Sequence, residues 1–91
     1  MTLQPLKTVE DSISAASSRA FYAQSLGEVD GAFEDLEDVH GYLRQKRDPY
    51  ERQYGELKVA HVLRNAMLAS WVISFARTRV KRGEPPPAYK M

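Results

Sequence analysis

The sequence predicts an all-α fold, on two observations. Apolar residues recur every three or four positions over most of the chain, and no window shows the strict alternation of a β-strand. Glycine and proline, which interrupt helices, fall at only a few points of the chain. We therefore expect an antiparallel helical hairpin whose first arm is kinked or broken near 27–31, with three helices over about 8–26, 30–46 and 49–82.

Ninety-one residues allow one small domain. We expect a flexible lead over 1–7, a single helical domain over 8–82 and a Pro-rich flexible tail over 83–91. The lead has neither the apolar core of a secretory signal nor the arginines of a transit peptide. Together with the absence of cysteine, this composition favours a cytoplasmic protein.

The first expected helix, 8–26, begins at Thr8, whose hydroxyl can accept a hydrogen bond from the Asp11 amide. Its apolar seam consists of Val9, Ile13, Ala16, Ala20, Ala23 and Leu26. Small and Ser-rich residues fill 12–18, so this helix can approach a neighbour closely but buries little area.

The second expected helix, 30–46, carries a seam formed by Val29, Phe33, Leu36, Val39 and Leu43. The two seams are out of phase by roughly 100° on a shared coiled-coil wheel, and Gly27 and Gly31 fall within the slip. Either a kink, or a full break with Asp30 as the next N-cap, accounts for this offset.

The third expected helix, 49–82, has the strongest start signal. Asp48 suits the N-cap, Pro49 suits the first helical position, and Glu51 completes a capping box. The helix is expected to end at Gly83 after roughly 50 Å. Its heptad seam is Val59, Val62, Ala66, Ala69, Ile73, Ala76 and Val80.

A second apolar set on this helix lies outside the seam: Leu63, Met67, Trp71 and Phe75. Between Ala66 and Ala76 the helix is apolar nearly all the way round, which is typical of a helix buried on most sides. One short chain has little to cover it, so we expect this face to bind a protein partner or a second copy of the chain. The alternative is a closed three-helix bundle in which the first helix folds back and covers the face.

Charge is separated along the chain although the net charge is only +1. An acidic belt comprises Glu28, Asp30, Glu34, Asp35, Glu37 and Asp38, and a basic end comprises Arg77, Arg79, Lys81 and Arg82. In the expected hairpin the belt lies beside 56–66, near Lys58 and Arg64, and the basic end lies near Lys7 and Arg19. The belt is predicted to contact a partner, and the basic end to bind phosphate or an acidic partner surface. A solvated helix end that complements the helix dipole is the alternative for the basic end.

No catalytic or metal-binding constellation accompanies these charges. Without cysteine there is no thiolate nucleophile or thiolate zinc site, and no serine lies in a nucleophile motif. Glu37 and His40 have the spacing of a di-iron ligand pair, but further carboxylates at suitable positions on a facing helix are missing. We expect no enzymatic activity, no metal and no cofactor.

Near the C-terminus, Pro86, Pro87 and Tyr89 belong to a Pro-Pro-Ala-Tyr sequence that resembles the PPxY short motif read by WW domains. The resemblance covers four residues. It implies a polyproline II segment that docks in an aromatic groove. The alternative is a stiff tail that only ends the helix.

These observations favour a non-enzymatic helical protein–protein interaction module: an adaptor, an inhibitor or an assembly subunit. One alternative is a nucleic-acid-associated protein that uses the basic end on phosphates. Another is a peripheral protein whose last helix lies on an anionic membrane surface. A membrane-spanning helix is not expected, because the longest uncharged stretch, 65–76, spans only about 18 Å.

Overall fold

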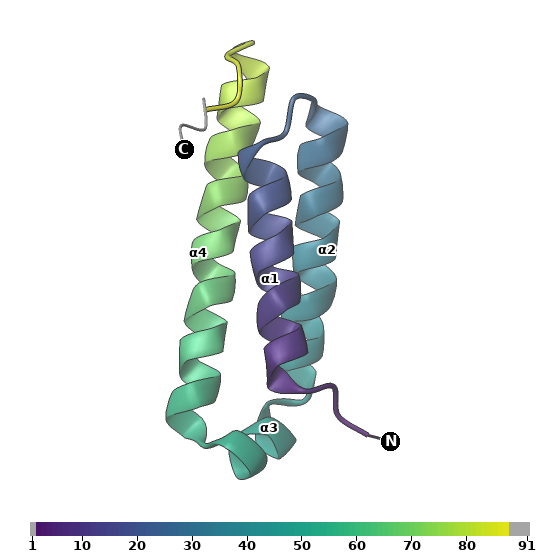
Figure 1. The fold of residues 1–91 in the computed structure, drawn as a ribbon, viewed down its shortest axis with the longest axis vertical. Helices are drawn as coiled ribbons and strands as arrows, with labels where there is room; N and C mark the ends of the chain where they lie inside the picture. The colour runs from purple at the N-terminus through teal and green to yellow at the C-terminus, as the bar shows by residue number, and fades with distance from the viewer. Residues whose placement is uncertain (1, 88–91) are drawn as a thin grey trace.

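In the computed structural model, which describes residues 2–87, the chain forms four helices and, within that range, no β-strand. The helices are α1 (Leu6–Phe21), α2 (Leu26–Gln45), α3 (Arg47–Tyr54) and α4 (Glu56–Lys81). Figure 1 shows α1, α2 and α4 side by side along the long axis, with the short α3 at the base between α2 and α4. The predicted all-α class is confirmed.

The chain breaks between α1 and α2 at residues 22–25, a few residues before the predicted 27–31. Ser25 caps α2, because its Oγ accepts a hydrogen bond from the Glu28 amide at 3.2 Å. The Glu28 carboxylate in turn accepts one from the Gln24 amide at 2.7 Å. In sequence this Ser-x-x-Glu pattern is a capping box, and it starts the helix before either glycine.

Gly27, Gly31 and the predicted N-cap Asp30 consequently lie inside α2. Gly31 has a packing role, because a Cβ there would lie 2.6 Å from Nη2 of Arg19 on α1. The missing side chain lets Arg19 reach across α2 and pair with Asp35, with 2.9 Å between Nη1 and Oδ2. Gly31 therefore leaves room for the guanidinium of Arg19 and does not end a helix.

The break is complete, so α1 folds back along both α2 and α4. The chain forms the closed three-helix bundle, in which α2 is antiparallel to α1 and α4, and α1 runs parallel to α4 (Figure 1). The seam predicted for the first helix is buried apart from Leu26, which begins α2 and is 40% exposed. On α2, Phe33 is 38% exposed and Ala32 is buried instead. On α4 the buried seam residues are Val59, Val62, Ala66, Ala69, Ile73 and Ala76.

The predicted helix over 49–82 is two helices, because Gly55 adopts φ 94° and ψ 152° between them. This backbone region is accessible essentially to glycine alone. α3 begins at Arg47 without a side-chain cap. Asp48 and Pro49 therefore lie in its first turn, and the prediction of Asp48 as the N-cap is wrong.

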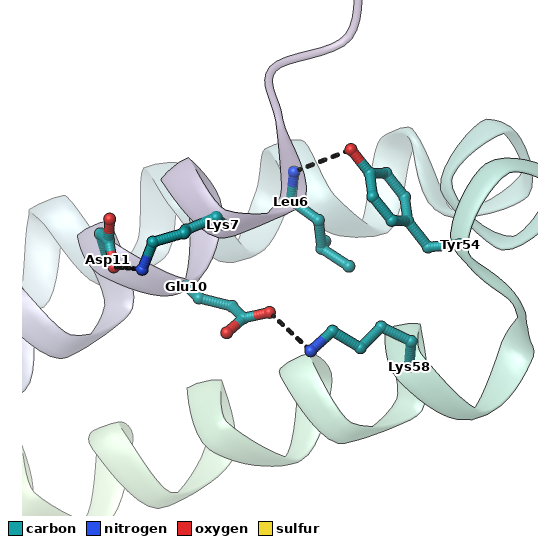
Figure 2. A network of polar contacts seen from close by, with 6 residues as sticks. All are labelled: Leu6, Lys7, Glu10, Asp11, Tyr54 and Lys58. Atoms are coloured by element: carbon teal, nitrogen blue, oxygen red, sulfur yellow. Dashed lines mark hydrogen bonds and ion pairs between the residues drawn. The ribbon is translucent and has the colours of Figure 1, made fainter.

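Inserting α3 shifts α4 along α2 by about three helical turns from the predicted register. Arg77 Nη2 on α4 lies 2.9 Å from Oδ1 of Asp30 on α2, so this end of the acidic belt does not lie beside 56–66. Lys58, which was predicted to face the belt, pairs instead with Glu10 of α1 at 3.3 Å (Figure 2).

Tyrosines hold the segment that precedes α1. The Tyr50 hydroxyl, on a side chain with 0% exposure, donates to the Gln4 carbonyl oxygen at 2.7 Å. The Gln4 amide donates to the Tyr42 hydroxyl at 3.0 Å. The Tyr42 and Tyr50 rings meet edge-on, with centroids 6.1 Å apart. Side chains from the end of α2 and the middle of α3 thus both bind the backbone of Gln4.

The first turn of α1 is held in the same way. The Leu6 amide donates to the hydroxyl of Tyr54 on α3 at 3.4 Å (Figure 2). α1 begins at Leu6 without a side-chain cap, so the predicted N-cap Thr8 lies within its first turn. Tyr54 of α3 therefore accepts a hydrogen bond from an amide that has no partner within α1. This bond connects α3 to the bundle.

We predict that the fold loses stability as the pH rises above about 10, because of Tyr50. Burial first, and then the hydrogen bond with Tyr42, raise the pKa of Tyr50 above its usual value of 10.0. A group whose pKa is raised in the folded state stabilises the fold fully below the pKa of the unfolded chain. That contribution is lost as the pH rises through the folded-state pKa.

The variant Tyr50→Phe tests this effect, since it keeps the ring and removes the titrating hydroxyl. It should lower the free energy of unfolding by about 1 kcal/mol at neutral pH and flatten the alkaline decline. Tyr42 works in the opposite sense, because the hydrogen bond from the Gln4 amide, followed by that with Tyr50, lowers its pKa. Tyr42→Phe also removes a hydrogen bond that raises the pKa of Tyr50, so its two effects oppose each other and it should change the decline less than Tyr50→Phe does. Urea unfolding followed by circular dichroism measures both, and an unchanged decline in Tyr50→Phe contradicts the assignment.

Candidate protein-interaction surface

The side of α4 that faces away from α1 and α2 carries large apolar side chains. Met67, Trp71 and Phe75 follow one another at four-residue intervals, so they lie on one face of the helix. They are 54%, 56% and 74% exposed, and Leu68 beside them is 43% exposed. We call these four residues the outer apolar strip.

The strip is exposed although the bundle is closed. Both α1 and α2 pack against the heptad seam of α4, which is buried. Side chains on the opposite side of a helix about 10 Å across cannot reach those neighbours. The folded-back α1 therefore encloses the seam and leaves Trp71 outside, whereas the closed-bundle alternative had α1 covering it. Leu63 differs from the other three predicted face residues, because it is half-buried and packs against the core.

Hollows lie on both sides of the strip. His40, Leu63 and Met67 help to line one of about 380 Å³ between α2 and α4. Phe21 and Phe75 help to line another, of about 300 Å³, at the C-terminal end of α1. A ridge of large side chains with depressions beside it is a surface into which a partner can insert apolar anchors.

The outer face of α4 carries no charge between Arg64 and Lys81, because the two intervening arginines turn toward the bundle. One of them, Arg77, pairs with Asp30 of α2 at 2.9 Å. Its guanidinium also lies 5.6 Å from the centroid of the Phe33 ring. The strip is therefore the centre of an uncharged surface about 25 Å long.

The other arginine, Arg79, binds the turn between α1 and α2. Its Nη2 donates to the carbonyl oxygen of Ala23 at 2.7 Å and to that of Phe21 at 3.2 Å. These oxygens lie at and just after the end of α1, where a helix has no partners of its own for them. Arg79 therefore holds α4 against the turn that closes the bundle.

The remaining cations of the predicted basic end are exposed. Lys81 and Arg82 lie at the end of α4, and Arg82 Nη1 is 3.9 Å from a carboxylate oxygen of Glu84. Lys7, expected beside the basic end, lies at the opposite end of the bundle because α1 runs parallel to α4. There it pairs with Asp11 at 3.5 Å (Figure 2).

Half of the acidic belt acts within the chain. Glu28 caps α2, and Asp30 and Asp35 pair with arginines of α4 and α1. The other three are exposed: Glu34, Glu37 and Asp38. The belt lies on α2, so it is on a different helix from the outer apolar strip.

The predictions for metals and for the tail concern other parts of the molecule. Among residues 2–87, no three His, Cys, Asp or Glu side chains lie close enough together to hold a metal ion. Of the tail motif, Pro86 and Pro87 have no regular secondary structure, and Tyr89 lies outside the described residues. The motif reading stays a prediction.

Within the described range, α4 is the one helix long and apolar enough to cross a membrane. The uncharged stretch 65–76 underestimates this length, because only Arg64 interrupts a longer apolar segment. In the bundle 33% of the apolar window is buried, and core helices of soluble proteins pass the same test. Length and hydropathy alone do not distinguish a membrane helix from a core helix.

Comparison with protein-family models, curated proteins and solved structures finds no match to this chain. The function is therefore inferred from the chain's own surface. The outer apolar strip is a feature of that surface that the fold itself does not use.

We predict that Arg79→Ala lowers the free energy of unfolding by about 1–3 kcal/mol, because it removes a donor from two carbonyl oxygens. Lys81→Ala, at a neighbouring exposed position, should change it by less than about 0.5 kcal/mol. Urea unfolding followed by circular dichroism measures both variants. Equal effects would show that Arg79 belongs to an open basic patch and does not hold the bundle together.

Proposed function

We propose that this chain is a non-enzymatic helical protein–protein interaction module that binds its partner through the outer apolar strip of α4. An adaptor, an inhibitor and an assembly subunit all use such a surface. The observation that carries the proposal is the 56% exposure of Trp71 on a helix whose other side fills the core.

The strip is large enough to drive association. Burying roughly 300 Å² of apolar surface stabilises a complex by about 7 kcal/mol before the costs of ordering are subtracted. Trp is also enriched among the residues that dominate binding energy at interfaces. Neither α1 nor α2 covers the strip, so its burial does not contribute to folding of the single chain and remains available for a partner.

The charges near the strip define the chemistry of the partner. Because the strip lies in the uncharged surface between Arg64 and Lys81, its complement is an apolar helix face or groove without charge at its centre. Lys81 and Arg82 are exposed at one end, where acidic groups of a partner would steer and orient the encounter. Lys81 and Arg82 would therefore orient the partner, and the outer apolar strip would supply most of the binding affinity.

The nucleic-acid alternative depends on the basic end. Arg77 and Arg79 are held against the bundle, which leaves Lys81 and Arg82 exposed. Two phosphate contacts correspond to a log–log salt slope of only about −2, which is typical of weak binding. The engagement of the two arginines thus supports a protein partner over nucleic acid.

The membrane alternative draws on the length and hydropathy of α4. Helices that lie on membranes set a broad apolar face against a strongly charged one. On α4 the side opposite the strip is the apolar seam, which is packed in the bundle, so only the narrow strip is available to lipid. Anionic vesicles form one arm of the test below.

We predict that Trp71→Glu abolishes partner binding and leaves the chain folded. Leu57→Glu is the matched control, because Leu57 is 89% exposed and lies two heptads earlier on the same side of α4, outside the strip. Wild type and Leu57→Glu should capture a partner from a lysate of the native host, and Trp71→Glu should not. Both variants should keep a free energy of unfolding within about 0.5 kcal/mol of wild type.

Three outcomes contradict this proposal. If Trp71→Glu unfolds the chain, Trp71 is a core residue and not a contact residue. Equal capture by wild type and Trp71→Glu places the binding surface elsewhere. Trp71-dependent binding to anionic vesicles, without capture of any protein, favours the membrane alternative.

A further inference from the structure

We propose that the partner of the outer apolar strip is a second copy of this chain, docked antiparallel about a two-fold axis that passes beside Trp71. This inference rests on the proposed function and specifies the partner. Three properties of the strip point to it: its symmetry, the charges that bound it and its area.

The strip is complementary to itself. In an antiparallel pair of α4 helices centred on Trp71, residues equally far before and after Trp71 lie level with each other. Met67 then lies level with Phe75 of the second copy, and Leu68 lies level with Ser74. The two Trp71 side chains lie next to each other at the axis, and methionine beside an aromatic ring is a favourable contact. A two-fold interface requires this kind of self-complementarity.

Charge selects the antiparallel arrangement over the parallel one. The uncharged surface is bounded by Arg64 at one end and by Lys81 at the other. In a parallel pair each cation meets its own counterpart, and like charges at close range oppose binding. In the antiparallel pair Arg64 lies level with Thr78 and Lys81 lies level with His61. The antiparallel pair therefore avoids the repulsion between like cations that a parallel pair would contain.

The area reaches what a stable dimer needs. With exposed fractions of 54%, 43%, 56% and 74%, the four side chains of the strip together expose on the order of 450 Å². Flanking groups such as Arg64 and Thr78 bring the contribution of one copy to roughly 600 Å², or about 1,200 Å² for the pair. This value is at the lower end of the range for specific interfaces, so the expected dimer forms reversibly with concentration.

Sedimentation equilibrium over micromolar to submillimolar concentration tests the dimer. The wild-type chain should change from monomer to dimer with concentration. Trp71→Glu and Met67→Glu should each weaken the dimer by at least about tenfold, and Leu57→Glu should leave it within about twofold of wild type. Two strip variants are used so that the result does not depend on the folding of one.

Introduced cysteines test the register, since the chain has none of its own. Arg64→Cys and Thr78→Cys lie one heptad before and one heptad after Trp71, on its side of α4, and they leave Met67, Trp71 and Phe75 in place. Mixed and oxidised, the two variants should form a disulfide-linked heterodimer. Either variant alone should form little, because two copies of the same position lie about 21 Å apart along the axis. A parallel pair predicts the reverse, with each variant linked to itself.

Three results would contradict different parts of these proposals. A wild-type chain that stays monomeric at submillimolar concentration overturns the dimer, and the proposed function stands if Trp71-dependent capture of another protein persists. Self-linking of each cysteine variant overturns the antiparallel register. A dimer that is unchanged in Trp71→Glu overturns both proposals, because the interface then lies away from the strip.

Discussion

A helix that packs against two neighbours can hide only the part of its surface that they cover, and α4 is apolar over more than that part. Its buried side supplies the seam on which α1 and α2 close. Its outer side still carries Trp71 and Phe75, which are 56% and 74% exposed. Among residues 2–87 no further helix lies over them. The fold and the proposed function therefore follow from one constraint: a helix that is too apolar for its own bundle.

Polar groups at the two ends of the bundle make this arrangement specific. At one end the Ser25 cap fixes where α1 stops and α2 begins, and Arg79 holds that turn against α4. At the other end Tyr50 and Tyr54 bind the backbone that leads into α1. These contacts fix the positions of α1, α2 and α4 relative to one another along the axis of the bundle. They also turn Arg79 inward and so help to keep the surface around the strip free of charge.

The periodicity of the apolar residues was sufficient to predict the all-α class, the α4 seam and most of the strip. It could not predict the position of the first break. The phase offset between the two seams indicates Gly27 and Gly31, whereas the start of α2 is set by the Ser25–Glu28 capping pattern just before them. Gly31 is explained only by Arg19 on another helix. Such a contact between distant segments leaves no local signal in a single sequence.

The sequence also could not predict the parts of the surface that depend on how α2 and α4 are positioned along each other. The inward turn of Arg77 toward Asp30 follows from the insertion of α3, which the strong Asp-Pro start signal concealed. The hollow that His40 shares with Met67 exists only once α2 and α4 are set at their observed heights. The 43% exposure of Leu68 depends on where α1 lies, because Leu68 borders that helix. Periodicity identifies which face is apolar, and packing decides which part of it stays exposed.

The most direct test of the central claim is the fluorescence of Trp71, the single tryptophan of the chain, recorded against concentration together with the molecular mass. The account predicts the emission of a solvent-exposed indole in the dilute monomer, and a shift to shorter wavelength that follows the increase in mass as the strip becomes covered. A monomeric chain whose indole already emits at short wavelength at high dilution would contradict it, because Trp71 would then be enclosed by its own bundle.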